Sequence, residues 1–286
     1  MWIPWALTCA SLNAVTSALT KRAAELGGAV AVTFWVFVLS VPLAAALLAI
    51  DGVPPVEPGF WPALAIGVTA NIAALTLRNL GLKLAPLSVA VPLLSFTPVF
   101  LLGTEALVLG DLPSARGVAG VLAIVAGAYT LNLDAARGGV LHPVRVVVRD
   151  RGCQCMLAVA FLWSLTSVID KWCVVRSSPA FYLATFHAGF VLGYLPLAAV
   201  WRRGVTLRRP RHWRRYALIA LIHFGSILAQ MIAIQLVLVS YVIAIKRSGM
   251  LLSVLIGAVY FGERGVRQRL AGAACMAVGV ALILTA

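Results

Sequence analysis

The sequence predicts an all-α polytopic membrane protein, with ten transmembrane helices arranged as two inverted five-helix repeats. Hydrophobic residues make up 62% of the 286 residues, charged residues make up 11%, and the mean hydropathy is +1.00. A water-soluble domain cannot bury so much apolar surface in one core. Ten spans of ~20 residues would use roughly 200 residues and leave short connections. Most of the chain is therefore expected to lie in lipid.

Ten apolar runs have the length that a membrane-spanning helix needs. Breaks rich in Gly and Pro separate several of them, such as DGVPP at 51–55 and GDLP at 110–113. The first run follows Met1 without a basic stretch, which favours a retained helix over a cleaved signal peptide. The runs cover residues 2–20, 29–50, 60–82, 86–109, 114–133, 153–172, 179–201, 214–237, 240–261 and 265–285.

A polar segment near the middle of the chain divides the runs into two groups of five. We therefore expect a first five-helix repeat at 1–136, a basic inter-repeat loop at 137–151 and a second five-helix repeat at 152–286. An odd number of helices per repeat inverts the second half in the membrane, as in many secondary transporters.

Matching residues at nearly constant offsets indicate that the two halves are repeats of each other. Small residues at turn spacing in the last run of each half also predict a face for close helix packing. The matched positions are Thr16-Ser17 and Lys21 with Thr166-Ser167 and Lys171, and Gly110-Asp111, Gly120 and Gly127 with Gly262-Glu263, Gly272 and Gly279.

The end of each half resembles the EamA-type repeat of the drug/metabolite transporter superfamily. The resemblance is carried by LLSVLIGAVYFGERGVRQRLAGAACMAVGVALIL and by its first-half counterpart LLGTEALVLGDLPSARGVAGVLAIVAGAYTLNL, where Asp111 replaces a Glu that is frequent in the family. It implies two EamA-like five-helix units and a secondary transporter, an exporter or exchanger of a small organic metabolite by alternating access. Amino acids, sugars, nucleotide sugars and phosphorylated metabolites are all substrates within the family.

Polar side chains inside the runs are expected to line a solute cavity, because ionisable groups at membrane depth cost on the order of 2.5–3.5 kcal/mol each. Asn71 and Arg78 in the third run share a helix face, and so do His223 and Gln230 in the eighth. The repeat offset superimposes the two pairs. All four are candidate substrate-binding residues, as is Trp163, although such side chains also serve as hydrogen bonds between helices.

Two adjacent cations, Lys246 and Arg247, lie inside the ninth run. The pair is similar to the Lys-Arg of the plastid triose-phosphate translocators, relatives in the same superfamily, and this resemblance implies that it binds an anionic group. A planar guanidinium and a compact ammonium both suit phosphate oxygens. The alternative is that both side chains snorkel toward the membrane interface.

Glu105 is the carboxylate that lies well inside an expected span, near the end of the fourth run. A carboxylate at this depth is a candidate for proton coupling. A salt bridge to an interfacial cation is the competing interpretation.

The leading substrate is an organic anion, with phosphorylated metabolites included. The alternative is export of an amino acid or other zwitterion, and minor alternatives are a flippase for lipid-linked phosphates and a membrane scaffold without transport. The expected partners are a small-molecule substrate and the lipid bilayer, without nucleic acid, and a homodimer is left open.

Neither an enzyme nor a cofactor is expected, because no acid-base or metal-binding set converges in the sequence. The four histidines and five cysteines are dispersed, at His142, His187, His212 and His223 and at Cys9, Cys153, Cys155, Cys173 and Cys275.

The distribution of positive charge predicts the topology. Counted together with the residues at the adjoining run ends, the segments that follow odd-numbered runs carry 17 Lys and Arg residues, against 3 after even-numbered runs. Because positive charge resists translocation, both termini are expected to be extracytoplasmic. The expected location is the bacterial inner (plasma) membrane.

Overall fold

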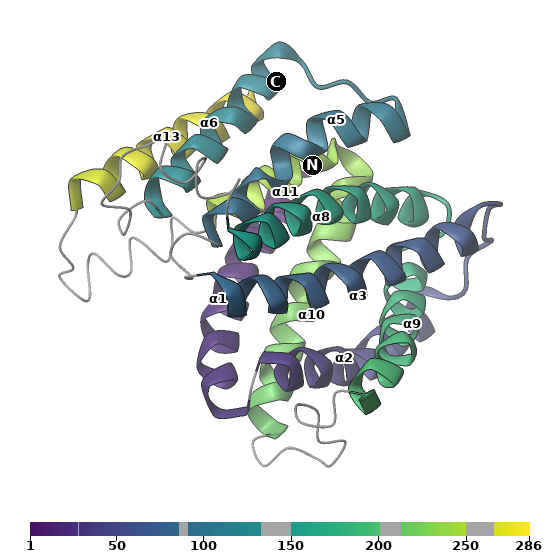
Figure 1. The fold of residues 1–286 in the computed structure, drawn as a ribbon. Coiled ribbons are helices and arrows are strands. Elements are labelled where there is room, and N and C mark those ends of the chain that lie inside the picture. Colours follow the sequence, from purple (N-terminus) through teal and green to yellow (C-terminus); the bar gives the residue numbers. More distant parts are fainter. Residues whose placement is uncertain (28, 86–90, 133–149, 201–212, 250–265) are drawn as a thin grey trace. The chain divides into compact units, whose positions relative to one another are not determined.

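The computed structural model describes residues 1–27, 29–85, 91–132, 150–200, 213–249 and 266–286, and every regular element in these ranges is a helix (Figure 1). The elements are α1 (Ile3–Gly27), α2 (Ala29–Asp51), α3 (Phe60–Leu84), the 3-10 helix η1 (Val91–Phe96), α5 (Thr97–Leu109), α6 (Ala115–Asn132), α8 (Arg151–Val175), α9 (Pro179–Val200), α10 (Trp213–Leu236), α11 (Val239–Ser248) and α13 (Val266–Leu284).

Each of the ten apolar runs contains a helix of the described chain, which confirms the all-helical class. Among the residues that the structure describes, four helices combine the length and the hydropathy of a membrane span, namely Val30–Asp51, Phe60–Leu84, Arg151–Val175 and Trp213–Leu236. The full set of ten spans and its inverted arrangement remain predictions.

The fourth run departs from a single continuous helix. Its described part begins with the 3-10 helix η1, and the α-helix α5 starts only at Thr97. Pro98 occupies the first turn of α5, where a residue without an N–H is tolerated because that group has no partner inside the helix. This proline is therefore compatible with a helix that starts at Thr97.

The described chain forms two compact units that interleave the sequence halves. Unit 1 contains Met1–Ile72 and Ile169–Leu236, and unit 2 contains Ala73–Val168 and Val237–Ala286. Each unit takes helices from both halves, so its boundaries differ from those of the sequence repeats. The repeats describe the sequence, whereas the units describe packing.

In unit 1, α1 packs against α10 and α2 packs against α9 and α10. An aromatic stack joins α2 to α9, with the rings of Phe37 and Phe190 4.0 Å apart and those of Phe190 and Tyr194 5.6 Å apart. Between α1 and α10, the Ser226 hydroxyl donates to the backbone oxygen of Cys9 at 3.0 Å. The buried residues Ala23, Val32, Val36, Tyr216, Ile219 and Ala220 form a core cluster.

In unit 2, α6 and α13 lie side by side in close contact (Figure 1). A Cβ atom added at Gly127 would lie 2.5 Å from the backbone oxygen of Gly272, and one at Gly120 would lie 2.8 Å from that of Gly279. The close packing face expected for the last run of each half is confirmed, and the two faces pack against each other.

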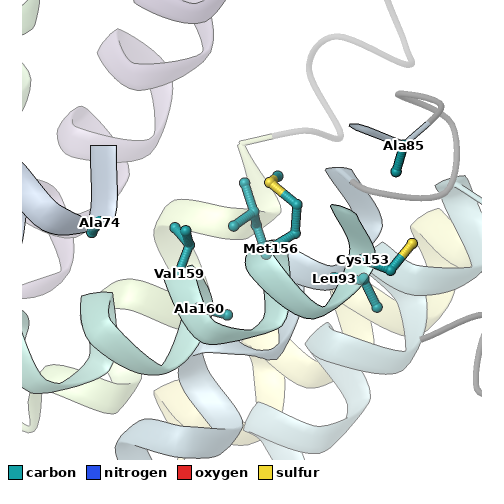
Figure 2. Packing of buried hydrophobic residues seen from close by; sticks show 8 residues of the cluster. Ala74, Ala85, Leu93, Cys153, Met156, Val159 and Ala160 are labelled. Carbon is teal, nitrogen blue, oxygen red and sulfur yellow. The ribbon is translucent and has the colours of Figure 1, made fainter. Parts of the chain in front are cut away.

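Unit 2 has an apolar cluster of its own, which joins α3, η1 and α8. Figure 2 shows its buried side chains, several of which lie along α8. A Cβ atom added at Gly152 would lie 2.6 Å from the Cβ of Ala85, so the two chain segments approach closely here. The cluster comprises Ala74, Ala85, Leu93, Leu94, Cys153, Met156, Val159 and Ala160, and Trp163 and Phe96 are among the partly buried residues packed against it.

Candidate functional site

Arg247 lies in the last turn of α11 and contacts residues of two other helices in unit 2. Its Nη2 donates to the hydroxyl of Thr97, at the start of α5, over 3.3 Å. Its guanidinium carbon lies 5.9 Å from the ring centroid of Trp163 on α8, at the outer limit of a cation–π interaction. The Thr97 hydroxyl donates to the Leu94 backbone oxygen at 2.7 Å, which leaves its lone pairs for Arg247.

One edge of the Arg247 guanidinium is incompletely hydrogen-bonded. The Nε atom is buried and has no hydrogen-bond partner among the described residues. Nε and Nη2 form the same edge of the group, and such an edge suits a carboxylate or phosphate with two parallel hydrogen bonds. Because an unsatisfied buried donor costs about 1–3 kcal/mol, an anion at this edge would be stabilising.

Two further cations belong to the same unit. Arg78 on α3 is half-buried and repels Arg247 electrostatically. Lys246 precedes Arg247 in the last turn of α11 and is also half-buried. Like charges repel strongly where the dielectric is low, so an anion beside Arg247 would reduce the repulsion between the two guanidinium groups.

Glu105 lies on α5 and is fully buried, with none of its surface exposed. Both of its carboxylate oxygens accept backbone hydrogen bonds from the start of α11. The distances are 2.6 Å from Val239 N to Oε1 and 3.0 Å from Ser240 N to Oε2. These contacts support a structural role for the carboxylate, with backbone amides among its partners, while its role in proton coupling stays a prediction.

The remaining predicted residues lie in unit 1, where their contacts are with neighbouring protein groups. Asn71 Nδ2 donates to the Gly67 backbone oxygen of its own helix at 3.0 Å. The buried Gln230 accepts from the Cys9 thiol at 4.0 Å, and the His223 ring lies 5.8 Å from that of Phe37. The contacts of His223 and Gln230 join helices, whereas that of Asn71 stays within its own helix. A role in substrate binding stays a prediction for these three residues.

The candidate site residues predicted from the sequence are thus divided between the two units. Unit 2 contains Arg78, Glu105, Trp163, Lys246 and Arg247, and unit 1 contains Asn71, His223 and Gln230. The structure brings Arg247 together with Trp163.

Two polar residues near these sites were not singled out by the sequence. Thr97 contacts Arg247, and the offset of about 150 residues between the sequence halves could have pointed to it. His187 is fully buried, with Nδ1 2.7 Å from the Leu183 backbone oxygen and its ring 5.4 Å from that of Phe37. Nothing in the sequence distinguishes His187 from an ordinary core residue.

The described residues hold no group of three His, Cys, Asp or Glu side chains that could bind a metal ion. The five cysteines, which all lie within the described ranges, are free thiols.

Comparison with known families identifies the family of this chain. The model of the EamA-like transporter family matches residues 1–133 and 150–285. The chain belongs to the EamA-like transporter family. The two matched ranges confirm the two EamA-type repeats inferred from the sequence, and membership identifies a membrane transporter of small molecules in a family that is not enzymatic.

No curated protein matches this transporter. A solved crystal structure is similar to it, with a TM-score of 0.77 and 20% sequence identity over 97% of this chain and 94% of that chain. At this identity the likeness shows the fold alone.

Proposed function

We propose that this transporter carries a small organic anion, a carboxylate or a phosphorylated metabolite, by alternating access. The observation that carries the proposal is the edge of the Arg247 guanidinium. Its Nε is buried without a partner among the described residues, and its Nη2 makes one long hydrogen bond of 3.3 Å. An anionic oxygen pair would satisfy both donors with charge-assisted hydrogen bonds.

The neighbouring residues support this assignment of roles. Arg78 and Lys246 add positive charge that attracts an anion and is in turn stabilised by it. Trp163 offers an aromatic surface beside the guanidinium, and Thr97 holds the Nη2 side of the group in place. The cost of keeping cations at membrane depth is a reason to expect them to be functional.

The repeat architecture supports the transport mode. Secondary transporters built from inverted repeats expose a central site alternately to either side of the membrane. We therefore propose exchange or export by this route, in a bacterial inner membrane with both termini extracytoplasmic.

The experiment is counterflow of radiolabelled solutes in proteoliposomes that contain the purified protein. The panel includes monocarboxylates, dicarboxylates, sugar phosphates, inorganic phosphate and neutral amino acids. We expect an anion to exchange, and we expect Arg247→Gln to slow that exchange at substrate concentrations below saturation. Arg116→Gln, a change of an exposed cation at the start of α6, should preserve it. Exchange of neutral amino acids alone, with equal rates in wild type and Arg247→Gln, would overturn the proposal.

A further inference from the structure

We propose that Glu105 is a positioning residue, which fixes the anion site by capping α11 from the neighbouring helix α5. The inference rests on the proposed function, because the cations that it would position are Lys246 and Arg247 at the other end of α11. It differs from proton coupling, since the carboxylate acts here as a fixed acceptor of backbone hydrogen bonds.

α11 needs an acceptor at its N-terminus. The helix is short, with 10 residues from Val239 to Ser248. The first N–H groups of any helix have no partner inside it. Leu238 at the N-cap position provides no side-chain hydrogen bond, and the first turn of α11 contains no acidic residue. The required acceptor therefore comes from another helix.

Glu105 meets this requirement with both oxygens. Val239 N and Ser240 N donate to Oε1 and Oε2 at 2.6 Å and 3.0 Å, and the side chain is completely buried. A carboxylate is also attracted by the partial positive charge at a helix N-terminus. Charge-assisted hydrogen bonds of this kind are stronger than those between neutral groups.

The same helix contacts both ends of α11. Glu105, in the second half of α5, contacts the start of α11, and Thr97, about two turns earlier, accepts from Arg247 near its end. The two helices are thus antiparallel, and α11 is fixed against α5 at two points roughly 12 Å apart along the helix axis. Loss of the first point would allow α11 to shift and would move the Arg247 guanidinium.

Substitution by glutamine tests the capping role, because an amide has one acceptor oxygen and two N–H donors. In Glu105→Gln, the amide nitrogen would face a backbone N–H, so one hydrogen bond would be replaced by a contact between two donors.

A second substitution can remove that conflict. Val239→Pro deletes one of the two N–H groups, and proline is favoured at the first position of a helix. The backbone of Leu238, at φ −58° and ψ 136°, already has the conformation that a residue before proline adopts. In the double variant, the glutamine oxygen would accept from Ser240 N without an opposing donor at position 239.

The experiment compares wild type, Glu105→Gln, Val239→Pro and the double variant as full chains in nanodiscs. Hydrogen exchange of the peptide that spans 239–248 reports the order of α11. Modification of Arg247 by phenylglyoxal, read by mass spectrometry, reports the position of its guanidinium. Glu57→Gln, at an exposed carboxylate in the segment between α2 and α3, serves as the control.

We expect Glu105→Gln to raise both the exchange rate and the modification rate about tenfold, the equivalent of ~1.4 kcal/mol. The double variant should recover most of the difference, and Glu57→Gln should behave as wild type. A purely structural role would instead lower the thermal stability and leave the modification rate of Arg247 in the folded protein unchanged, which would overturn the proposal. If Glu105→Gln does not fold, the proposal still requires that the double variant folds and that Val239→Pro alone affects both rates less than tenfold.

Inorganic phosphate and acetate added to the wild-type protein separate this inference from the proposed function. Protection of Arg247 from phenylglyoxal by either anion supports an anion site. Absence of protection by these and the other anions of the transport panel would count against the anion site, whereas the exchange of 239–248 would still decide whether Glu105 caps α11.

Discussion

Thr97 accepts a hydrogen bond from Arg247 at 3.3 Å, although the two residues lie in different halves of the sequence. The contact holds one side of the guanidinium and leaves Nε, on the same edge, without a partner among the described residues. A threonine hydroxyl is a weaker partner for arginine than a carboxylate, so an anionic ligand can compete for this edge.

Arg247→Gln should weaken the transported anion roughly 10- to 150-fold, which corresponds to the ~1.5–3 kcal/mol of a hydrogen bond to a charged group. Arg247→Lys should recover only part of the affinity, since an ammonium cannot make two parallel hydrogen bonds from one edge. The measurement is equilibrium binding of the substrate identified by counterflow, with folding checked by thermal unfolding. Equal affinities in well-folded wild type and Arg247→Gln would contradict the anion site.

Lys246→Gln separates binding from snorkelling at the neighbouring position. If the ammonium attracts the substrate, the change should weaken binding, and Lys246→Arg should not fully restore it. If the side chain only reaches toward the interface, affinity should be unchanged, and removal of a charge from lipid depth should preserve or raise the melting temperature. Binding and thermal unfolding of the same preparations distinguish the two outcomes.

Gly127→Ala should destabilise the packing of α6 against α13. The added Cβ would lie 2.5 Å from the Gly272 backbone oxygen, so the helices would have to separate. Overpacking of this kind typically costs about 1–3 kcal/mol. Gly103→Ala is the matched control, because a Cβ at that exposed position in α5 would meet no atom within 4 Å. It should leave the melting temperature unchanged or raise it, since Ala is the better helix former. Equal melting temperatures in the two variants would contradict the close packing.

The sequence was sufficient to locate the helices, because a membrane-spanning helix needs ~20 apolar residues and several of the breaks between runs contain Gly and Pro. It also indicated the glycine faces of α6 and α13, since small residues at turn spacing signal close packing in lipid. It did not predict the 3-10 segment before Thr97, which a run of apolar residues does not distinguish from an α-helix. The interleaving of the halves in the two compact units is a property of tertiary packing.

The sequence predicted some residues of the candidate site and missed their backbone partners, for a similar reason. Arg247 and Trp163 stand out in the sequence as a charged and a large aromatic residue inside expected spans, and the structure brings the guanidinium carbon to 5.9 Å from the ring centroid. The partners of Glu105 include the amides of Val239 and Ser240, and a backbone amide is present at nearly every position of a chain. Sequence therefore identifies a buried carboxylate but not the backbone groups that it binds.

Cysteine labelling tests the predicted topology. In a background that lacks the five native cysteines, Thr206→Cys should resist an impermeant maleimide in intact cells, whereas Ala286→Cys should react. The reason is that the segment around position 206 carries the largest cluster of arginines, which resist translocation. Labelling of both variants after permeabilisation is the control. Reaction at 206 and protection at 286 in intact cells would invert the orientation.

Glu105→Gln distinguishes a capping carboxylate from a proton carrier by the mode of transport that it impairs. A proton carrier replaced by a neutral amide should lose uptake driven by a pH gradient and retain exchange of solute for solute, since the amide mimics the protonated state. A capping carboxylate should affect both modes together, because its loss disturbs the position of Lys246 and Arg247 in every step that binds substrate. We expect the second result, with the apparent affinity for substrate reduced in both assays and partly restored by Val239→Pro. Loss of gradient-driven uptake with unchanged affinity in exchange would identify Glu105 as the coupling residue.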